Sequence, residues 1–592
     1  MCGIAGQYCF KNGNPDRKLL ATMSERLIHR GPDGKGEYIN EVIGMIHRRL
    51  AIIDLSADGI QPMTNEDKSL WLVFNGEIYN YIELREDLTK KGHIFKSQSD
   101  TEVILHAYEE WGSDCLNRFN GMWAFALWDE KKQELFCARD RFGIKPFYYT
   151  VINGSFIFAS EIKALLAYPD VGNKPNDNMV YTYLAWGVQD HCDQTMFEGI
   201  FQILPGNAMI VNKKGIKSFR YWDIQINPTV DDSCKFISLL RDLLANAVRL
   251  HLRSDVVVGT CLSGGIDSST IVALIKKEES HLKQKTFSVT FKDKQFDESK
   301  YIHKITSATG IESSFTEPSA DKLWDDIDRL IYIQDEPFGS LSIYAQYCVM
   351  RLASKQVKVI LDGQGADELF AGYIGYQSSY IRGLITSFKW GTAICEITGT
   401  MLHHHDFVAN AIRQLIIRKK RRVLLKHKPE PINRYQGSLD QVLYRELTST
   451  NLPALLHYED RNSMAFSVEA RVPYLDINLV NYIAVLPLNE KIRNGITKIS
   501  LREATKYIIP ESIRNRQDKM GFVTPEEQWM KHELKSQILN ILVSKSFNSR
   551  SYWDAKAVTN NYLEFIRGKS AYSFDIWRII CTELWLRKFI DQ

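Results

Sequence analysis

The chain of 592 residues lacks the features of a secreted, membrane-spanning or nucleic-acid-binding protein. Its 10 cysteines include no CxxC pair and no Cys/His cluster with zinc spacing, and they are far too sparse for a disulfide scaffold. The formal net charge is only +3, so the basic footprint of a nucleic-acid-binding protein is missing. No apolar run reaches the ~20 residues of a membrane helix, and the opening residues MCGIAGQYCF do not resemble a signal peptide. We therefore expect a cytoplasmic protein with reduced thiols and with neither nucleic acid nor a membrane as a partner.

Two short clusters could suggest a nucleic-acid, membrane or metal partner, but each has a simpler interpretation. The run RKKRR at 418–422 is basic, yet the balanced overall charge favours a solvated helix face. The histidines His403–His405 are adjacent, and three adjacent residues on a helix cannot all face one ion. We expect neither cluster to bind such a partner.

Residues 2–215 contain mostly short strand patterns. Apolar or alternating runs such as Leu70–Phe74, Met122–Trp128 and Ser155–Ala159 are bounded by turn-forming pairs, with few helical patterns between them. This pattern predicts a layered antiparallel α+β domain. The polar, proline-containing stretch that follows predicts a linker over 216–233.

Residues 234–592 have a different character. The buried-strand pattern Val256–Leu262 is followed by a glycine-rich turn and a helical pattern, and further strand patterns occur at Thr286–Phe291 and Val357–Leu361. Alternation of strand, loop and helix predicts an α/β domain with a parallel sheet. Everything after about Gly372 is predicted to be helical.

Cys2 is a candidate nucleophile. It is followed by Gly3, a context in which the initiator Met1 is usually removed. Removal leaves a thiol and a free α-amine on one residue, and an α-amine with a pKa of about 7.7–8.0 is partly neutral near physiological pH. Such an amine can accept the proton of its own side chain, which is the arrangement of N-terminal nucleophiles.

Further segments give this cysteine a context. CGIAG, HRGPDG, RLAIID, FNGEIYN and SDTEVIL occur in this order, and together they resemble the class II glutamine amidotransferase domain. The resemblance covers residues 2–215. It implies a four-layer αββα sandwich of the N-terminal nucleophile hydrolase type and hydrolysis of the glutamine side-chain amide through a thioester on Cys2.

The same resemblance implies roles for individual residues. Asn75 and the backbone N–H of Gly76 would form the oxyanion hole, a feature that typically contributes about 10²–10³-fold to a rate. Arg49 would hold the α-carboxylate of glutamine. Glu77 and Asp100 would bind its α-ammonium group.

A glycine-rich loop marks the second domain. The segment TCLSGGIDSST follows an apolar strand and opens a helix, with Ser263, Gly264, Gly265 and Ser268 at the turn. Backbone N–H groups before a helix N-terminus form an anion site. No lysine follows the glycines, so the loop is not of the GxxxxGK[ST] type. It resembles the pyrophosphate-binding loop of the ATP pyrophosphatases.

Two later segments add charged groups. The loop LDGQGADELFAGY contains Gly363 and Gly365, followed by the carboxylates Asp367 and Glu368, which suit Mg²⁺ bound together with phosphates. The segment NGITKISLRE contains Lys498, whose charge suits a site of phosphoryl chemistry.

With SVEARVPYLD, these segments resemble glutamine-hydrolysing asparagine synthetase over essentially the whole chain. The resemblance implies a C-terminal parallel sheet of the ATP pyrophosphatase (HUP-like) type with a large helical extension. It implies that Mg·ATP activates the β-carboxylate of aspartate as an acyl-adenylate and that ammonia then displaces AMP. Asp267 and Asp367 would hold Mg²⁺, and Lys498 would stabilise the departing pyrophosphate. The implied ATP-binding residues are Leu262, Ser263, Gly264, Gly265, Asp267, Ser268, Val289, Asp362 and Gly363.

The chain departs from the family pattern in one loop. Many members have Glu where this chain has Gln364, and often Ser where it has Asp362. Gln cannot act as a base. The proton that the attacking ammonia loses could pass to the substrate, to pyrophosphate or to another carboxylate such as Glu368.

Three other functions remain as alternatives. The departure at Gln364 and the long segment Ile381–Leu452 are compatible with a relative that amidates a cell-envelope sugar, a peptide or a secondary metabolite. A β-lactam synthetase-like enzyme would not need an intact Cys2 site. A catalytically dead scaffold is disfavoured because Cys2, Asp267 and Lys498 are all present. The sequence leaves open whether the chain forms a homodimer.

Overall fold

The computed structural model describes residues 2–11, 13–226, 233–279, 283–404, 424–427, 429–518 and 524–591. The basic run 418–422, His405 and residues 227–232 of the predicted linker lie outside these ranges.

The N-terminal domain contains two six-stranded sheets in which the paired strands are antiparallel. The first has the order β10-β8-β9-β1-β3-β2, and the second the order β12-β11-β7-β6-β5-β4. The strands of the first are β1 (Gly3–Cys9), β2 (Gly34–Ile39), β3 (Ile43–Arg49), β8 (Tyr148–Ile152), β9 (Ser155–Ala159) and β10 (Phe201–Gln202). Those of the second are β4 (Met63–Thr64), β5 (Leu70–Ile78), β6 (Gly121–Asp129), β7 (Glu134–Arg139), β11 (Asn207–Asn212) and β12 (Gly215–Arg220).

Helices cover the outer faces of this pair of sheets. Helix α1 (Arg17–Arg26) packs on β1 and β3, while α2 (Tyr81–Lys90) and α3 (Asp100–Trp111) cover the second sheet. A separate apolar core, which includes Ile4 and Trp128, fills the space between the two sheets. Strand β6 is buried almost throughout because both of its faces are covered, so its sequence is a continuous apolar run. The predicted αββα sandwich is confirmed.

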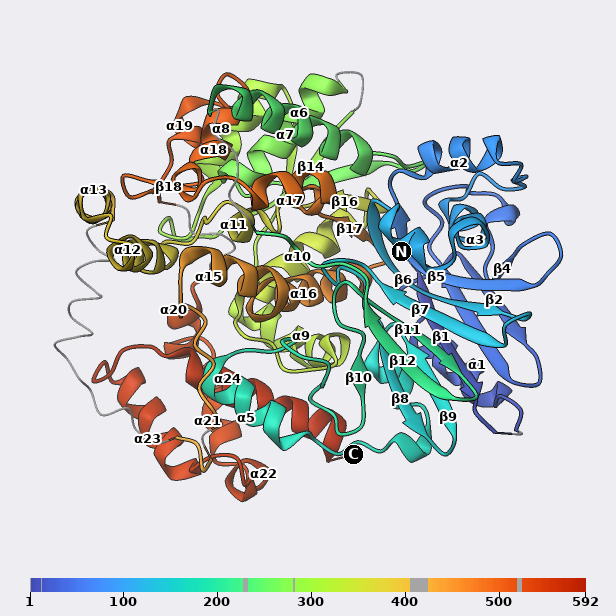
Figure 1. Cartoon of the computed structure of the whole chain (residues 1–592). Coiled ribbons are helices and arrows are strands. Elements are labelled where there is room, and N and C mark those ends of the chain that lie inside the picture. Colours follow the sequence, from blue (N-terminus) through green and yellow to red (C-terminus); the bar gives the residue numbers. More distant parts are fainter. Residues whose placement is uncertain are drawn as a thin grey trace.

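The C-terminal domain is built on a five-stranded sheet with the order β15-β14-β13-β16-β17. Every pair in it is parallel. Its strands are β13 (Val258–Cys261), β14 (Lys285–Val289), β15 (Ser313–Thr316), β16 (Val359–Leu361) and β17 (Glu469–Arg471). Helices α6 (Ser233–His251) and α7 (Ile266–Glu278) pack together, and α10 (Ser342–Ala353) packs against β14 and β15. The predicted parallel α/β domain with a helical extension is confirmed. Figure 1 shows part of the extension as red helices, namely α20 (Glu526–Lys531), α21 (Lys535–Leu542), α22 (Lys545–Ser549), α23 (Ala555–Ile566) and α24 (Phe574–Trp585).

Two local expectations need correction. Strand β17 lies beyond Gly372, where we predicted only helices, and it pairs with β16 through Glu469 and Val359. Three residues are too few to show a strand period in a sequence. Strand β12 extends into the segment that we predicted as a linker.

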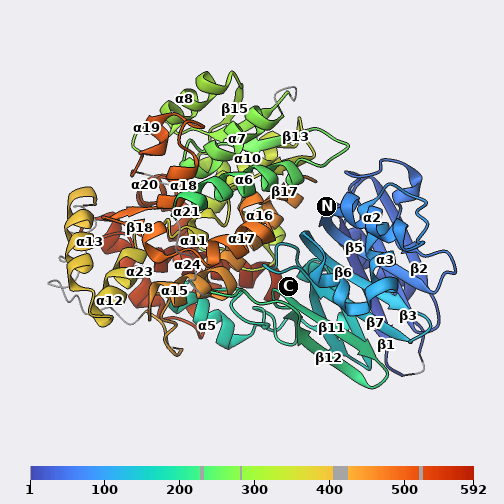
Figure 2. The same ribbon diagram turned by 45° about the horizontal axis from the view of Figure 1, so that its top comes forward.

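The two domains share a hydrophobic core. Helix α5 (Asp177–Trp186) of the N-terminal domain packs against α24 (Phe574–Trp585), and Tyr183 and Trp577 belong to one buried cluster. Figure 2 shows the domains side by side, with the N-terminus on the side of the first domain that faces the second. A catalytic group at Cys2 therefore lies close to the domain boundary.

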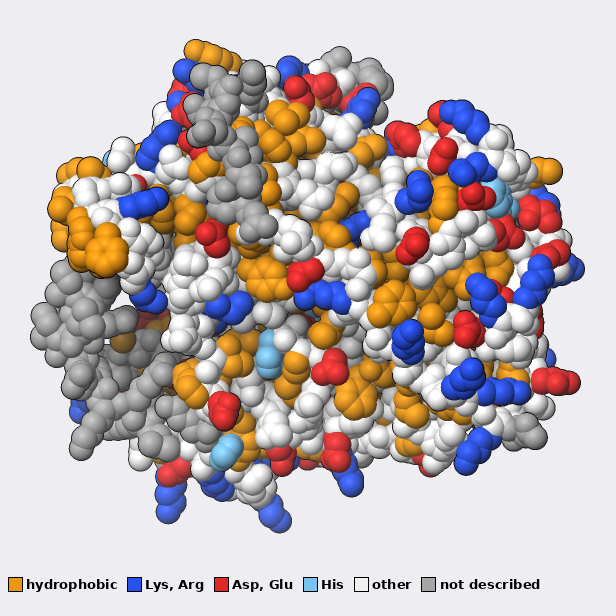
Figure 3. Space-filling model, viewed as in Figure 1, with side chains coloured by type: hydrophobic (Ala, Val, Ile, Leu, Met, Phe, Trp, Pro, Cys, Tyr) orange, Lys and Arg blue, Asp and Glu red, His pale blue; other side chains and the backbone are white. Residues whose placement is uncertain are grey.

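The surface carries both signs of charge. On the face in Figure 3, Lys and Arg side chains alternate with Asp and Glu, and no large area has a single sign. Apolar side chains are exposed around α13 (Trp390–His403), namely Phe388, Trp390, Ile394, Met401 and Leu402. Among the described helices, none has the length and apolar character needed to cross a membrane.

Candidate active sites

Cys2 lines a pocket of the N-terminal domain. Four of the predicted glutamine-site residues line this pocket with Cys2, and Asn75 adjoins it through its contact with the Cys2 backbone. The four lining residues are Arg49, Gly76, Glu77 and Asp100. Three different elements supply them, since Arg49 ends β3, Gly76 and Glu77 lie in β5, and Asp100 opens α3. The structure thus brings together the whole predicted set around the thiol.

Asn75 is held in place by one end of its side-chain amide. Its Oδ1 accepts a hydrogen bond from the backbone nitrogen of Cys2 at 3.0 Å. Its Nδ2 is buried, and among the described residues no group accepts a hydrogen bond from it. An unsatisfied buried donor beside a nucleophile is suited to an oxyanion. Gly76 is required here because a Cβ atom would lie 2.1 Å from the carbonyl oxygen of Met122.

The pocket has a positive end and a negative end. The Arg49 guanidinium donates to the carbonyl oxygens of Ser56 and Asp54. Burial raises the pKa of Asp100 to about 6. Burial and the neighbouring Asp100 raise the pKa of Glu77 well above its ordinary value. The arrangement matches the zwitterionic end of an α-amino acid, with its carboxylate at Arg49 and its ammonium at the two carboxyl groups.

The C-terminal domain also contributes to this pocket. Glu469 of β17 lines it, and Arg471 of the same strand lies 3.2 Å from Glu77 and 2.6 Å from Glu469. Sequence reasoning missed Glu469. The available signal was the i, i+2 spacing of Glu469 and Arg471, which places both side chains on one face of a strand.

The predicted pyrophosphate loop lies between β13 and α7. Ser263 Oγ and Ser268 Oγ are 3.1 Å apart, and the Ser263 backbone nitrogen donates to Ser268 Oγ at 3.2 Å. Gly264 has a φ of +74°, and a Cβ atom there would lie 2.8 Å from Tyr301 Cβ. The loop therefore folds tightly before a 13-residue helix, with the geometry of an anion site.

Leu262 and Val289 lie at the carboxyl ends of two adjacent strands. Strands β13 and β14 pair in parallel, and Leu262 follows the first while Val289 ends the second. Ligands of open α/β sheets bind outside the carboxyl ends of the strands. The position fits the predicted walls of a nucleotide base.

Lys498 connects the two carboxylates that were predicted to bind Mg²⁺. Its Nζ is 2.6 Å from Asp267 Oδ1 and 2.6 Å from Asp367 Oδ1. A Cβ atom on Gly372 would lie 2.2 Å from Lys498 Cε, so glycine makes room for this contact. Two carboxylates that converge beside an anion loop form a hard-oxygen donor set, which fits Mg²⁺ held jointly with phosphate oxygens.

The two remaining predicted residues of this loop, Gly363 and Asp362, face different parts of the structure. The position of a Cβ atom on Gly363 would be 3.2 Å from Asp267 Cβ, so this loop approaches the predicted metal residues. The Asp362 carboxyl group instead faces Cys261, Gln346 and Glu459. Its side chain is therefore not gathered with the other predicted ATP residues.

Arg516 is a further candidate that sequence reasoning missed. Its Nη1 donates to the carbonyl oxygen of Gly264 at 3.3 Å, and its guanidinium lies 3.8 Å from the Tyr301 ring centroid. It also pairs with Glu298 and Asp518. Arg516 is remote in sequence from every motif, so no spacing rule points to it.

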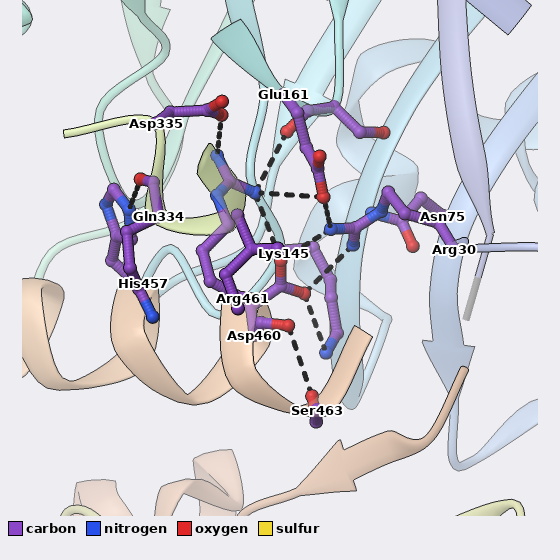
Figure 4. Close-up of polar contacts among 12 residues, drawn as sticks. Arg30, Asn75, Lys145, Glu161, Gln334, Asp335, His457, Asp460, Arg461 and Ser463 are labelled. Carbon is purple, nitrogen blue, oxygen red and sulfur yellow. Dashed lines mark hydrogen bonds and ion pairs between the residues drawn. The ribbon is translucent and has the colours of Figure 1, made fainter. Parts of the chain in front are cut away.

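Buried charges around Arg30 and Asp460 connect the first domain to helix α16 (Leu452–Met464) of the second domain (Figure 4). Arg30 Nε donates to the Cys2 carbonyl at 3.1 Å, and its two terminal nitrogens donate to Asp460 at 2.8 and 3.0 Å. Arg30 Nη1 also donates to Glu161 at 2.8 Å. Burial alone would raise the pKa of Asp460, but Arg30 and Lys145 hold it below its ordinary value. The backbone of the nucleophile is thus fixed to the other domain.

Comparison with known sequences matches both domains. The family of the glutamine amidotransferase domain matches residues 1–222, and the asparagine synthase family matches residues 239–587. Asparagine synthetase [glutamine-hydrolyzing] 1 of Bacillus subtilis (strain 168) is 32% identical, over 99% of this chain and 96% of the relative. The chain belongs to the glutamine-hydrolysing asparagine synthetase family.

Two more relatives show the breadth of this asparagine synthetase family. Asparagine synthetase [glutamine-hydrolyzing] 3 of the same bacterium is 33% identical, over 87% of this chain and 86% of the relative. The Amidase chyE of Penicillium rubens is 26% identical, over 94% of each chain. The chain is therefore a carbon–nitrogen ligase that uses glutamine as its nitrogen donor and ATP for activation.

Proposed function

We propose that this asparagine synthetase family member amidates the β-carboxylate of aspartate with ammonia from glutamine. The observation that carries the proposal is the pair of sites on one chain. A pocket with ends of opposite charge surrounds Cys2, and a Lys498–carboxylate centre adjoins an anion loop. Buried ion pairs join the two domains that carry these sites.

Glutamine hydrolysis begins at Cys2 in this proposal. With Met1 removed, the α-amine of Cys2 takes the thiol proton, and the sulfur attacks the side-chain amide carbon of glutamine. Asn75 Nδ2 and the Gly76 N–H stabilise the oxyanion, while Asn75 Oδ1 keeps the Cys2 nitrogen in place. Ammonia leaves, and water hydrolyses the thioester to glutamate.

Carboxylate activation takes place in the second domain. The loop of Ser263, Gly264 and Gly265 binds pyrophosphate oxygens at the N-terminus of α7. Asp267 and Asp367 would hold Mg²⁺, which would supply positive charge beside the phosphates. The acceptor carboxylate attacks the α-phosphorus, pyrophosphate leaves, and Lys498 stabilises the charge that develops on the phosphoryl oxygens. Ammonia then displaces AMP from the acyl-adenylate.

In this scheme, the buried boundary between the domains protects ammonia from protonation by water. Ammonia in neutral water is mostly protonated and is then not a nucleophile. A passage from Cys2 to the acyl-adenylate keeps it neutral and locally concentrated. Buried groups such as Arg30, Asp460 and Arg471 keep the boundary closed to solvent.

A different carboxylate is the second candidate acceptor. The loop departs from the family pattern at Asp362 and Gln364. In the long segment Ile381–Leu452, the structure has the end of α12 (Tyr376–Thr386) and the whole of α13. A 26% identical relative is named an amidase. These observations favour a relative that amidates a sugar acid, a peptide or a secondary metabolite.

Pyrophosphate–ATP exchange tests the acceptor directly. The purified chain is incubated with labelled pyrophosphate, ATP, Mg²⁺ and each of a panel of carboxylic acids, without glutamine or ammonia. Aspartate is expected to give the fastest exchange. If another acid gives exchange while aspartate gives none, the acceptor assignment is wrong although the adenylation chemistry stands.

A further inference from the structure

Glu459 of α16 is a buried carboxyl group to which the mechanism above gives no role. Its side chain is 2% exposed, and among the described residues neither of its oxygens has a hydrogen-bond partner. A carboxylate in such a position is costly unless it holds a proton or pairs with another group. It is therefore a candidate for proton chemistry.

The carboxyl group of Asp362 is the first neighbour of Glu459. The two groups face each other, with Cys261 of β13, Gln346 of α10 and Lys145 of the first domain around them. Asp362 Oδ1 accepts a hydrogen bond from the Gly363 nitrogen at 2.5 Å, and its Oδ2 has no partner in the described part of the chain. The pair thus lies where β16 enters the loop that approaches Asp267.

The pair is also at the end of a series of buried polar groups that starts at the Cys2 pocket. Glu469 lines that pocket. Lys145 Nζ lies 3.5 Å from the Ala470 carbonyl oxygen and 3.9 Å from Asp460 Oδ1, which places it between β17 and α16. Lys145 in turn attracts Glu459 electrostatically. Lys145 therefore lies between the strand that reaches the Cys2 pocket and the helix that carries Glu459.

The loop sequence explains why such a pair would be needed. Residue 364 is Gln, which cannot accept a proton as a base, whereas residue 362 is Asp. The segment DGQG thus has a carboxylate at 362 and none at 364, where a DGEG or SGEG loop has one. Glu459 faces the Asp362 carboxylate from helix α16.

We propose that the Asp362–Glu459 pair accepts the proton that ammonia loses when it attacks the activated carboxylate. The nitrogen lone pair forms the C–N bond, the bond to the AMP oxygen breaks with its electrons, and one N–H proton passes to the pair. The products are the amide, AMP and a protonated pair, which later releases its proton to solvent. This inference rests on the proposed function.

The surroundings suit the pair to this task. Burial raises the pKa of both carboxyl groups, and the charge of Asp362 raises the pKa of Glu459 further, while the interaction with Glu459 partly opposes the rise for Asp362. Because burial disfavours the charged form, each of the two carboxyl groups holds a proton more readily than an exposed carboxyl group does. Lys145 opposes the rise for Glu459, while Asp460 adds to it.

Three variants of the full-length protein test the proposal: Glu459→Gln, Asp362→Asn and the double variant Asp362→Ser/Gln364→Glu. Glutaminase activity and pyrophosphate–ATP exchange are expected to stay near wild type in all three. Ammonia-dependent amidation is expected to fall ~10²-fold in the first two, the scale of a lost general base. The double variant, which returns a carboxylate to position 364, is expected to recover at least a tenth of the wild-type rate. Glu368→Gln is the rival variant, since burial raises the pKa of Glu368 to about 7.

Hydroxylamine separates proton acceptance from a structural role. It is largely unprotonated at neutral pH and loses its proton more readily than ammonia after attack. Hydroxamate formation by Glu459→Gln and Asp362→Asn is therefore expected within a few-fold of wild type. Equal loss with hydroxylamine and ammonia, or a large loss in Glu368→Gln alone, would overturn the proposal. Absence of exchange with aspartate in the wild type would instead contradict the acceptor assignment, and the pair is then tested with the acid that does support exchange.

Discussion

Arg471 of the C-terminal domain lies 3.2 Å from Glu77 in the pocket of the N-terminal domain. Both side chains are buried, and Arg471 also contacts Glu469 at 2.6 Å. One strand thus supplies groups to the glutamine pocket while its neighbour β16 leads into the ATP loop. A direct buried ion pair therefore joins the pocket around Cys2 to the sheet of the C-terminal domain.

Glu77→Gln is expected to weaken glutamine binding without affecting ammonia-dependent synthesis. The charged hydrogen bond to the α-ammonium group is replaced by a neutral one, a loss of about 1.5–3 kcal/mol. KM for glutamine is expected to rise at least tenfold, as measured by glutamate release. Glu83→Gln is the matched control, because Glu83 pairs with Arg253 at the surface nearby. An unchanged KM in Glu77→Gln would remove Glu77 from the binding of glutamine.

The sequence predicted the individual sites better than their connection. Cys2, Asn75, Gly76 and Asp100 are predictable because each lies in a short motif with a backbone-dependent role. Arg30 is different, since its partner Asp460 is 430 residues away. Contacts between residues so far apart in sequence depend on how the two domains pack together. No local periodicity or motif spacing predicts that packing.

Glu469 illustrates the same limit on a smaller scale. Its strand has only three residues, and its side chain reaches a pocket formed by the other domain. The predicted helical region after Gly372 therefore missed the strand that joins the two sites. Asp362 shows the reverse case, because its position in a motif suggested ATP binding while its side chain faces Glu459.

Cys2→Ala is expected to abolish glutamine-dependent synthesis and to leave ammonia-dependent synthesis intact. The alanine cannot form the thioester, whereas the second site receives ammonia from solvent. Amide formation is measured with glutamine and with ammonium chloride in parallel. Cys9→Ala is the control, since Cys9 ends strand β1, which begins directly after Cys2, and does not line the pocket. Loss of both activities in Cys2→Ala would contradict two separable sites.

Lys498→Ala is expected to reduce synthesis ~10²–10³-fold, the scale of a lost electrostatic stabiliser. The variant leaves Asp267 and Asp367 without the cation that lies 2.6 Å from each. Pyrophosphate–ATP exchange should fall by the same factor while glutaminase activity persists. Lys506→Ala serves as a comparison on the exposed turn after α18 (Ile499–Ala504). Normal exchange in Lys498→Ala would place Lys498 outside the chemistry.

The pH dependence of glutamine binding is expected to report Asp100. Burial raises its pKa to about 6, so the carboxyl group is ionised above that pH and neutral below it. Only the ionised form attracts the α-ammonium group, so KM for glutamine should rise as the pH falls through 6. Asp100→Asn should have a high KM that no longer changes in this range. Because the bound ammonium group stabilises the ionised form, kcat should depend on pH less steeply than kcat/KM does near 6. A wild-type KM that stays constant from pH 7.5 to 5.5 would show that Asp100 does not bind the ammonium group.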